Sequence, residues 1–196
     1  MSLRIYGNRL IKTLPGGDTR PTPSRVRQAL FNIWQGQIEG CRWLDLCSGS
    51  GSMGAEALCR GAALVVGIEQ SSRAAAVVTE NWQKVAQPHQ QFRLIRGDVL
   101  EKLATLKGQT FDRIYFDPPY ASDLYEPVLE AIAQHALLAP HGEMAVEHGG
   151  DRFSDPHLQT LLPRIAPLVP CREKVYGNTA LLFLRGRERG SDGVLE

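Results

Sequence analysis

The chain has few cysteines and no long apolar run, and each absence excludes a class of protein. Its 196 residues include four cysteines, with no C-x-x-C pair and no regular spacing to the five histidines. Neither a zinc site nor a disulfide framework is therefore indicated, and the thiols are expected to be buried. No stretch approaches the roughly 20 consecutive apolar residues of a membrane span, and the N-terminus lacks the apolar run of a signal peptide. These absences favour a cytoplasmic protein.

The chain also lacks a large excess of charge, since its formal net charge is only +1. This near-balance hides an asymmetry along the sequence. Residues 1–27 hold six basic side chains and one acid, a local charge of +5, so the other 169 residues sum to −4. Concentrated positive charge is typical of a surface that meets a phosphate-rich partner. A solvated N-terminal arm without a partner is the alternative.

The length and the 43% hydrophobic content suit one core and a single compact domain with a small extension. Residues 3–6 and 9–12 flank Gly7-Asn8, a dipeptide that favours a tight turn, and this predicts a short hairpin. Apolar residues at helical spacing predict an amphipathic helix over 24–36, with Ser24 as its N-cap.

After Gly40, short apolar runs alternate with helical segments. The expected strands are 43–46, 64–68, 92–95, 113–116 and 143–146. The expected helices are 53–60, 71–85, 99–106 and 122–138. This alternation predicts an α/β fold with right-handed crossovers and a parallel sheet that has helices on both faces. Residues 173–176 and 180–184 predict a closing antiparallel hairpin, and the last dozen residues predict a loose tail.

The tetrapeptide Asp117-Pro118-Pro119-Tyr120 follows the apolar run 113–116 and so lies where a buried strand ends. Two consecutive prolines fix φ near −65°, so the turn is stiff. The Asp117 carboxylate and a backbone carbonyl of the turn can both accept hydrogen bonds from one planar NH2 group. The Tyr120 ring can stack on a nucleobase. An ordinary Pro-Pro turn with an exposed tyrosine is the alternative interpretation.

A glycine-rich segment, Gly49-Ser50-Gly51-Ser52-Met53-Gly54, joins the first expected strand after Gly40 to a helix. Glu69 ends the next strand, 18 residues after Gly51. Such glycines let the backbone approach a ligand closely, and an acid in this place accepts from ribose hydroxyls. The arrangement indicates a nucleoside-containing cofactor, because both NAD enzymes and methyltransferases use it.

Two further acids favour S-adenosylmethionine over NAD. Asp45 precedes the glycines by four residues, where its carboxylate would meet a cationic amino group and not a pyrophosphate. Asp98, in Gly97-Asp98-Val99, follows the third strand, where a carboxylate and a backbone N–H could receive an adenine amino group. Asp98 could equally cap the helix that follows, and both roles are compatible. If the first and fourth strands after Gly40 are neighbours, Asp117 faces the glycine loop.

With these motifs, the sequence resembles the class I S-adenosylmethionine-dependent amino-methyltransferases. Arg20-Pro21-Thr22, Arg25-Val26-Arg27 and Leu30-Phe31-Asn32 resemble the N-terminal signature of the RsmD family, which methylates guanine N2 in bacterial small-subunit (16S) ribosomal RNA. The resemblance spans residues 3 to 185. It implies a Rossmann-like class I methyltransferase fold, with a mainly parallel seven-stranded sheet, a closing antiparallel hairpin and an N-terminal hairpin and helix.

The resemblance also implies roles for individual residues, with no metal required. The residues implied to hold the target amine and base are Asp117, Pro118, Pro119 and Tyr120. Those implied to bind S-adenosylmethionine are Asp45, Ser48, Gly49, Ser50, Gly51, Glu69, Gln70, Asp98, Val99, Arg20 and Thr22. Those implied to contact RNA are Arg4, Arg9, Arg25, Arg27 and Asn32. The expected division is an RNA-binding extension (1–38), a methyltransferase domain (39–185) and a flexible tail (186–196).

The implied partner is small-subunit ribosomal RNA, either free or within a 30S particle, and nothing in the sequence requires more than a monomer. Pro23-Ser24 and Cys47-Ser48 depart from the usual family pattern, although small polar residues fit both places. Two alternatives stay open: an adenine-N6 methyltransferase of DNA or RNA, which shares D-P-P-Y, and a non-catalytic RNA-binding assembly factor that retains the fold.

Overall fold

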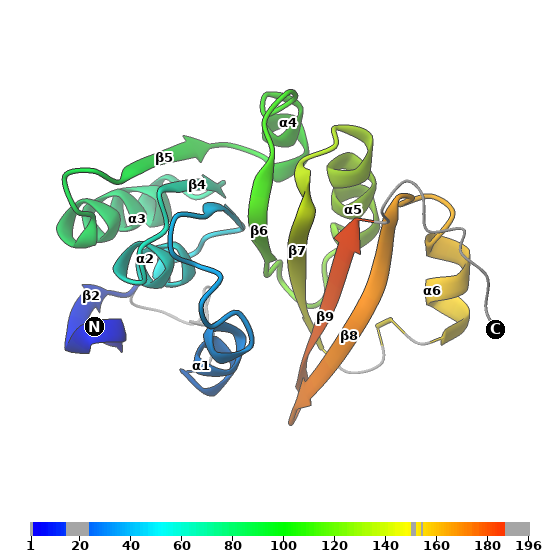
Figure 1. Ribbon diagram of the computed structural model, residues 1–196, viewed down its shortest axis with the longest axis horizontal. Helices are drawn as coiled ribbons and strands as arrows, with labels where there is room; N and C mark the ends of the chain where they lie inside the picture. The colour runs from blue at the N-terminus through cyan, green and yellow to red at the C-terminus, as the bar shows by residue number, and fades with distance from the viewer. Residues whose placement is uncertain (1, 15–23, 150–151, 154, 187–196) are drawn as a thin grey trace.

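The computed structural model describes residues 2–14, 24–149, 152–153 and 155–186 (Figure 1). Arg20 and Thr22, which were predicted to bind the cofactor, lie outside these residues, as does the expected tail apart from Gly186. No helix within the described residues is long and apolar enough to cross a membrane.

A seven-stranded sheet forms the centre of the molecule (Figure 1). Its strands are β3 (Arg42–Leu46), β4 (Leu64–Glu69), β5 (Gln91–Arg96), β6 (Phe111–Phe116), β7 (Leu138–Gly149), β8 (Leu168–Tyr176) and β9 (Thr179–Gly186). They lie in the order β5-β4-β3-β6-β7-β9-β8, and the first five are parallel. Strand β9 runs antiparallel to both neighbours. The mainly parallel sheet with a closing antiparallel hairpin is therefore confirmed.

Helices cover both faces of the sheet, as predicted. They are α1 (Ser24–Ile33), α2 (Ser52–Cys59), α3 (Ser72–Val85), α4 (Val99–Ala104), α5 (Tyr125–Gln134) and α6 (Asp155–Leu161). One hydrophobic cluster joins α1, α2 and α3 to one face of the sheet. A second cluster joins α4, α5 and α6 to the other face. Adjacent strand residues divide between the two clusters, because side chains alternate across a strand: Tyr115 is in the first and Phe116 in the second.

The largest departure from the expected elements follows α5. The sequence predicted a helix over 122–138, but α5 ends at Gln134 and Ala136 adopts a positive φ of 49°. The chain then enters β7, which begins at Leu138 because Leu138 pairs with Phe111 in the neighbouring strand. Long-range pairing outweighs local helix propensity here. Helix α6 and the first residues of β8 were not predicted either.

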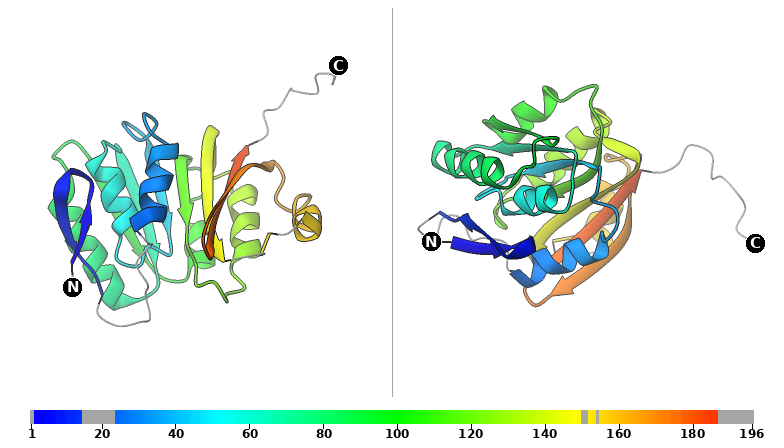
Figure 2. Two further views of the ribbon diagram at one scale, coloured as in Figure 1. Left: turned by 90° about the horizontal axis from the view of Figure 1, so that it is seen from below. Right: turned by 60° about the vertical axis from the view of Figure 1, so that its left-hand side comes forward.

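The N-terminal hairpin consists of β1 (Ser2–Ile5) and β2 (Arg9–Lys12), joined by a 3-10 turn, η1 (Tyr6–Asn8). Gly7 and Asn8 have positive φ values of 69° and 62°, as the predicted tight turn requires. The hairpin lies against α2 and α3 (Figure 2). Asn81 of α3 accepts from the Lys12 N–H at 2.8 Å and donates to the Lys12 carbonyl at 2.9 Å.

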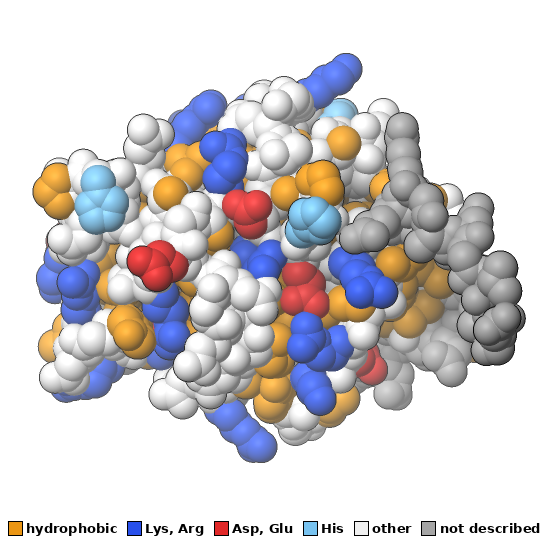
Figure 3. Space-filling view, in the orientation of Figure 1, with side chains coloured by type: hydrophobic (Ala, Val, Ile, Leu, Met, Phe, Trp, Pro, Cys, Tyr) orange, Lys and Arg blue, Asp and Glu red, His pale blue; other side chains and the backbone are white. Residues whose placement is uncertain are grey.

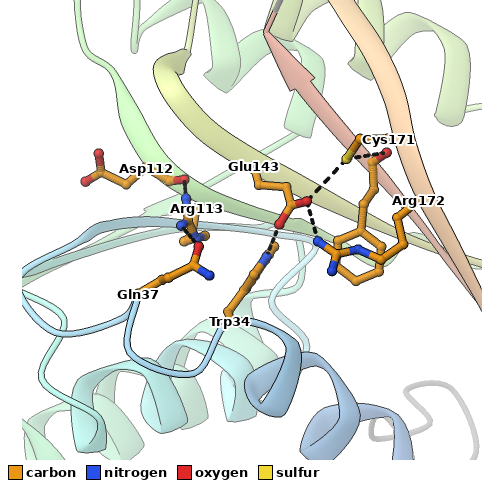
Figure 4. Close-up of polar contacts among 8 residues, drawn as sticks. Trp34, Gln37, Asp112, Arg113, Glu143, Cys171 and Arg172 are labelled. Carbon is orange, nitrogen blue, oxygen red and sulfur yellow. Dashed lines mark hydrogen bonds and ion pairs between the residues drawn. The ribbon is translucent and has the colours of Figure 1, made fainter.

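Helix α1 is joined to the sheet through a buried tryptophan and a glutamate of β7 (Figure 4). The Trp34 indole donates to Glu143 Oε2 at 2.5 Å, and Arg172 of β8 donates to Glu143 Oε1 at 2.7 Å. Arg113 of β6 donates to the side chain of Gln37, just after α1. The first and third of these bonds connect the segment that follows α1 to β7 and β6, and the second joins β7 to β8. Together they keep the N-terminal helix beside the sheet.

Candidate active site

A cavity of about 720 Å³ lies at the carboxyl ends of β3, β4 and β6. Strand β3 is the point where strand order reverses, since β4 and β5 lie on one side of it and β6 and β7 on the other. Ligands bind at this place in open α/β sheets. The register pairs Leu46 with Phe116, so the glycine loop and Asp117 leave neighbouring strands. The expected adjacency of the first and fourth strands after Gly40 is confirmed.

Most residues predicted to hold cofactor or base line this cavity. They are Asp45, Ser48, Gly49, Ser50, Glu69, Gln70, Asp98, Val99, Asp117, Pro118, Pro119 and Tyr120. Gly51 does not line it. A Cβ at Gly51 would lie 2.8 Å from both Trp82 Nε1 and Val78 Cγ1, so this glycine permits the loop to pack on α3.

Backbone conformation and a carboxylate fix the shape of the glycine loop. Cys47, Gly49 and Gly51 have positive φ values of 60°, 56° and 72°. Glu69 accepts from the Gly49 N–H and from the Ser71 N–H, each at 2.8 Å. Because one carboxylate spans the loop and the start of α3, Glu69 holds the rim of the cavity in place while facing it.

Asp45 is almost fully buried beneath the loop and accepts from the Gly54 N–H at 3.1 Å. Burial raises the pKa of Asp45 to about 8, and the nearby Glu69 carboxylate acts in the same direction, against the Gly54 hydrogen bond. A buried carboxyl that still lines a cavity is prepared to meet a cation, since a positive ligand group would favour its charged form.

Asp98 caps α4, as one of its two sequence-based roles required. Its Oδ1 accepts from the Leu100 N–H at 2.9 Å and from the Glu101 N–H at 3.2 Å. The side chain also lines the cavity. Capping with one oxygen therefore leaves the carboxylate facing the space where a ligand amino group would lie.

Tyr120 projects its ring into the cavity but is anchored at its hydroxyl. The residue is 42% exposed. Its hydroxyl contacts Glu147 Oε1 at 3.0 Å and Thr179 Oγ1 at 2.8 Å. Partial burial raises the pKa of Tyr120 to about 12, so the phenol stays protonated at neutral pH.

Several residues that line the cavity were not predicted to belong to a site, among them Tyr115, Glu147, Asn178 and Thr179. Glu147 is 2% exposed, and burial raises the pKa of its carboxyl. Its place directly after the apolar run 144–146 of an expected strand was a signal of a buried polar role. Nothing local marked Thr179, because it reaches the cavity only through the pairing of β7 with β9.

The prediction that Arg27 contacts RNA is wrong. Arg27 is 2% exposed, and its guanidinium donates to Glu56 Oε2 at 2.8 Å and to the Arg4 carbonyl at 2.9 Å. Arg27 lies four and seven residues before Phe31 and Trp34, so it shares their buried face of α1. Helical spacing could have identified this position as buried.

None of the residues predicted to contact RNA lines the cavity. Arg25 and Asn32 are exposed on α1, and the Arg25 guanidinium lies 5.9 Å from the centre of the Tyr176 ring. Arg9 is exposed and donates to the Val85 carbonyl at 2.9 Å, whereas Arg4 donates to Asn8 within the hairpin turn.

The expectation of four buried thiols holds for Cys41 alone. Cys47 and Cys59 are half-buried and Cys171 is exposed. Cys171 lies on β8, where its thiol donates to Glu143 Oε1 at 3.2 Å. Burial raises the pKa of Cys47, which lines the cavity, to about 12, so its thiol is neutral at pH 7.

Comparison with known proteins decides the family. The sequence pattern of the family described as Conserved hypothetical protein 95 matches residues 3–185. The chain belongs to this family. Ribosomal RNA small subunit methyltransferase D of Escherichia coli is 30% identical over 204 residues, covering 97% of this chain and 93% of that protein. YlbH of Bacillus subtilis is 31% identical over 182 residues, covering 91% and 94%.

The fold of this protein is similar to that of a solved structure. The yhhF protein of Escherichia coli superposes with a TM-score of 0.78 at 26% identity, covering 96% of this chain and all of that one. The resemblance to the RsmD family and the Rossmann-like methyltransferase fold are therefore confirmed.

Proposed function

We propose that this protein transfers a methyl group from S-adenosylmethionine to the exocyclic N2 of a guanine in bacterial 16S ribosomal RNA. One observation carries the proposal: a single cavity joins the glycine loop after β3 to the D-P-P-Y turn after the neighbouring β6. The relatives named as ribosomal RNA small subunit methyltransferases support the substrate class. The N-terminal signature supports the choice of guanine.

The residues around the loop fit S-adenosylmethionine by their chemistry. Three acids line one side of the cavity: Asp45 would hold the cationic amino group, Glu69 the ribose hydroxyls, and Asp98 the adenine amino group. When bound, the cofactor supplies an electrophilic methyl group on a positively charged sulfur. Among the described residues that line the cavity there are acids and no basic side chain, and this donor set suits the cation better than a pyrophosphate.

The D-P-P-Y turn would prepare the target amine. The lone pair of an exocyclic amine is delocalised into the base, so the nitrogen is a poor nucleophile in a planar geometry. Hydrogen bonds from the NH2 group to the Asp117 carboxylate and the Pro118 carbonyl would fix the nitrogen and favour a tetrahedral geometry. On taking the methyl group from the sulfonium, which would leave as a neutral thioether, the amine would lose one proton to water. Tyr120 would stack on the extruded base.

The exposed basic residues of the N-terminal part would hold RNA phosphates. Arg4, Arg9 and Arg25 remain candidates, whereas Arg27 does not. On the face shown in Figure 3, Lys and Arg side chains are spread among a few acidic ones and do not form one stripe. Because the three candidate arginines lie within residues 1–38, we assign the RNA contact to this part and catalysis to residues 39–185. An rRNA substrate in turn implies action in the bacterial cytoplasm, and nothing in the proposal requires more than a monomer.

The direct test is methyl transfer from labelled S-adenosylmethionine to 30S subunits, and separately to free 16S rRNA, both from cells that lack the homologous enzyme. We expect label on N2 of a single guanine, identified by mass mapping of RNA fragments. Comparison of the two substrates tells whether the particle or the free RNA is used. Label on an adenine, or on DNA alone, would contradict the proposal.

The same assay with Asp117→Ala tests the role of the D-P-P-Y turn. We expect at least a 100-fold loss of transfer, because the main acceptor for the amine is gone, with RNA affinity retained. If a folded Asp117→Ala protein transfers at the wild-type rate, the chemical role of the turn is wrong. If the wild-type protein binds RNA without any transfer, a non-catalytic assembly factor replaces the enzyme as the better description.

A further inference from the structure

Tyr120 is held at its hydroxyl, its ring and its backbone carbonyl, although the residue is exposed. Its hydroxyl contacts Glu147 of β7 and Thr179 of β9. Its backbone carbonyl accepts from Arg152 Nη2 at 3.0 Å. Its ring packs against Gly149, where an added Cβ would lie 2.9 Å from Tyr120 Cδ2. An exposed tyrosine ordinarily needs no such restraint, since its ring can rotate in water.

The hydrogen bonds at the hydroxyl have a defined direction. Glu147 accepts from Tyr115 at one carboxylate oxygen and from Tyr120 at the other. The Tyr120 hydroxyl has a single proton, which it donates to Glu147. Thr179 must therefore donate to the Tyr120 oxygen, and its hydroxyl has no freedom to reverse. Glu147 and Thr179 are both buried, so these bonds are shielded from water.

The same glutamate holds a second tyrosine that lines the cavity. Tyr115 of β6 pairs in register with Asp45 on β3, beneath the glycine loop, and it lines the cavity together with Glu147. Tyr120 lies in the D-P-P-Y turn that follows β6. One buried carboxylate thus fixes the hydroxyls of a strand tyrosine and of the turn tyrosine.

We propose that Glu147 and Thr179 are positioning residues that hold the Tyr120 ring at a fixed angle as a stacking surface for the target base. This inference rests on the proposed function, which supplies the base. A ring that is already immobile loses little conformational entropy when a base stacks on it, and it presents the amine at one distance from the methyl donor. The hydroxyl bonds to two neighbouring strands supply that immobility.

The test removes hydroxyls without removing rings or volume. Tyr120→Phe deletes the bonds to both Glu147 and Thr179, whereas Thr179→Val deletes only the second. We expect Thr179→Val to lower kcat on RNA about tenfold, the effect of one buried hydrogen bond, and Tyr120→Phe to lower it at least as much, while the Kd for S-adenosylmethionine stays unchanged. Because Thr179 acts only through the Tyr120 hydroxyl, the double variant should be no slower than Tyr120→Phe.

Two controls separate positioning from general stability. Tyr125→Phe deletes a phenol that donates to the Glu147 backbone carbonyl at 3.2 Å, and Thr79→Val deletes a hydroxyl bonded within α3. Both should retain wild-type kcat. Glu147→Gln keeps an acceptor and adds a donor, so it should retain more activity than Glu147→Ala. Wild-type kcat for Tyr120→Phe, or losses that multiply in the double variant, would overturn the proposal.

A measurement without RNA distinguishes this inference from the proposed function. With 13C-labelled tyrosine rings, NMR should show slow ring flipping for Tyr120 in the wild type and faster flipping in Thr179→Val. Equal flipping in the two proteins would overturn the positioning role even if methyl transfer is observed. Absence of transfer by the wild type, with slow flipping retained, would reject the proposed function and leave the restraint on the ring established.

Discussion

Asp45 and Arg27 are both buried charged residues, yet their surroundings give them opposite roles. Arg27 has a carboxylate partner 2.8 Å away, so its charge is neutralised within the fold. Asp45 has only a backbone N–H at 3.1 Å among its described hydrogen-bond partners, and burial raises its pKa. A buried acid without a cation leaves part of its interaction for a ligand. The partners of each side chain therefore distinguish Arg27, part of a structural ion pair, from Asp45, a binding group.

The raised pKa of Asp45 predicts proton release on cofactor binding. With a pKa of about 8, Asp45 is mostly protonated at pH 7, whereas a cationic amino group favours the carboxylate and lowers that pKa. The affinity for S-adenosylmethionine should thus increase as pH rises from about 6 toward 8, and binding at pH 7 should release a proton. Calorimetry in two buffers of different ionisation enthalpy measures this proton. Asp45→Asn should abolish it, and identical binding enthalpies for the wild type would contradict the assignment.

At the scale of elements, the glycine loop is shaped by α3 as much as by the ligand. The Trp82 indole of α3 donates to the Gly51 carbonyl at 2.8 Å and fills the space beside Gly54 and Gly67. Two of the three glycines in the G-x-G-x-x-G pattern, Gly51 and Gly54, therefore face a tryptophan. The motif was predicted to allow close approach of a ligand, and here it also allows α2 and α3 to pack.

This packing predicts that Gly54→Ala is destabilising, although alanine is the better helix former. A Cβ at Gly54 would lie 2.4 Å from Trp82 Cζ2, and the indole cannot retreat while its N–H is bonded. Overpacking of about 3 kcal/mol outweighs a propensity gain of about 1 kcal/mol. We expect the free energy of unfolding, measured with denaturant, to fall by about 2 kcal/mol.

Gly186→Ala is the control for this substitution. The nearest heavy atom to an added Cβ there is the Pro140 carbonyl oxygen at 3.9 Å, an ordinary contact. Its unfolding free energy should stay within about 0.5 kcal/mol of the wild type. Equal stability of the two variants would show that α3 does not constrain the loop.

For the molecule as a whole, the N-terminal part is joined to the core by hydrophobic contact and by buried polar bonds. Ile5 and Ile11 of the hairpin and Phe31 of α1 belong to the same hydrophobic cluster as Trp43 of the central sheet. The basic residues behind the local charge of +5 were predicted to bind RNA phosphates. The fold separates them, since Arg27 is buried and Arg25 is exposed.

Arg25→Ala should accordingly change RNA affinity, whereas Arg27→Ala should change the free energy of unfolding. Loss of Arg25 removes an exposed charge, so RNA affinity should fall and the slope of log K against log salt should decrease in magnitude by about 1, with stability unchanged. Loss of Arg27 leaves the buried Glu56 with Arg60 as its one ion-pair partner in the described part of the chain, so the free energy of unfolding should fall by about 3 kcal/mol. Salt titration of RNA binding and denaturant unfolding measure the two effects. A stable Arg27→Ala protein with a reduced salt slope would reverse our correction.

The sequence alone determined the α/β class, the glycine loop, the Asp98 cap and the D-P-P-Y turn, because each depends on residues close together in the chain. Local spacing sets helix faces, strand ends and turn conformations. Only the tertiary structure decided that Glu147, Thr179 and Tyr115 join Tyr120 in one network. These contacts arise where β6, β7 and β9 pair, and strand pairing brings together residues that no local pattern relates.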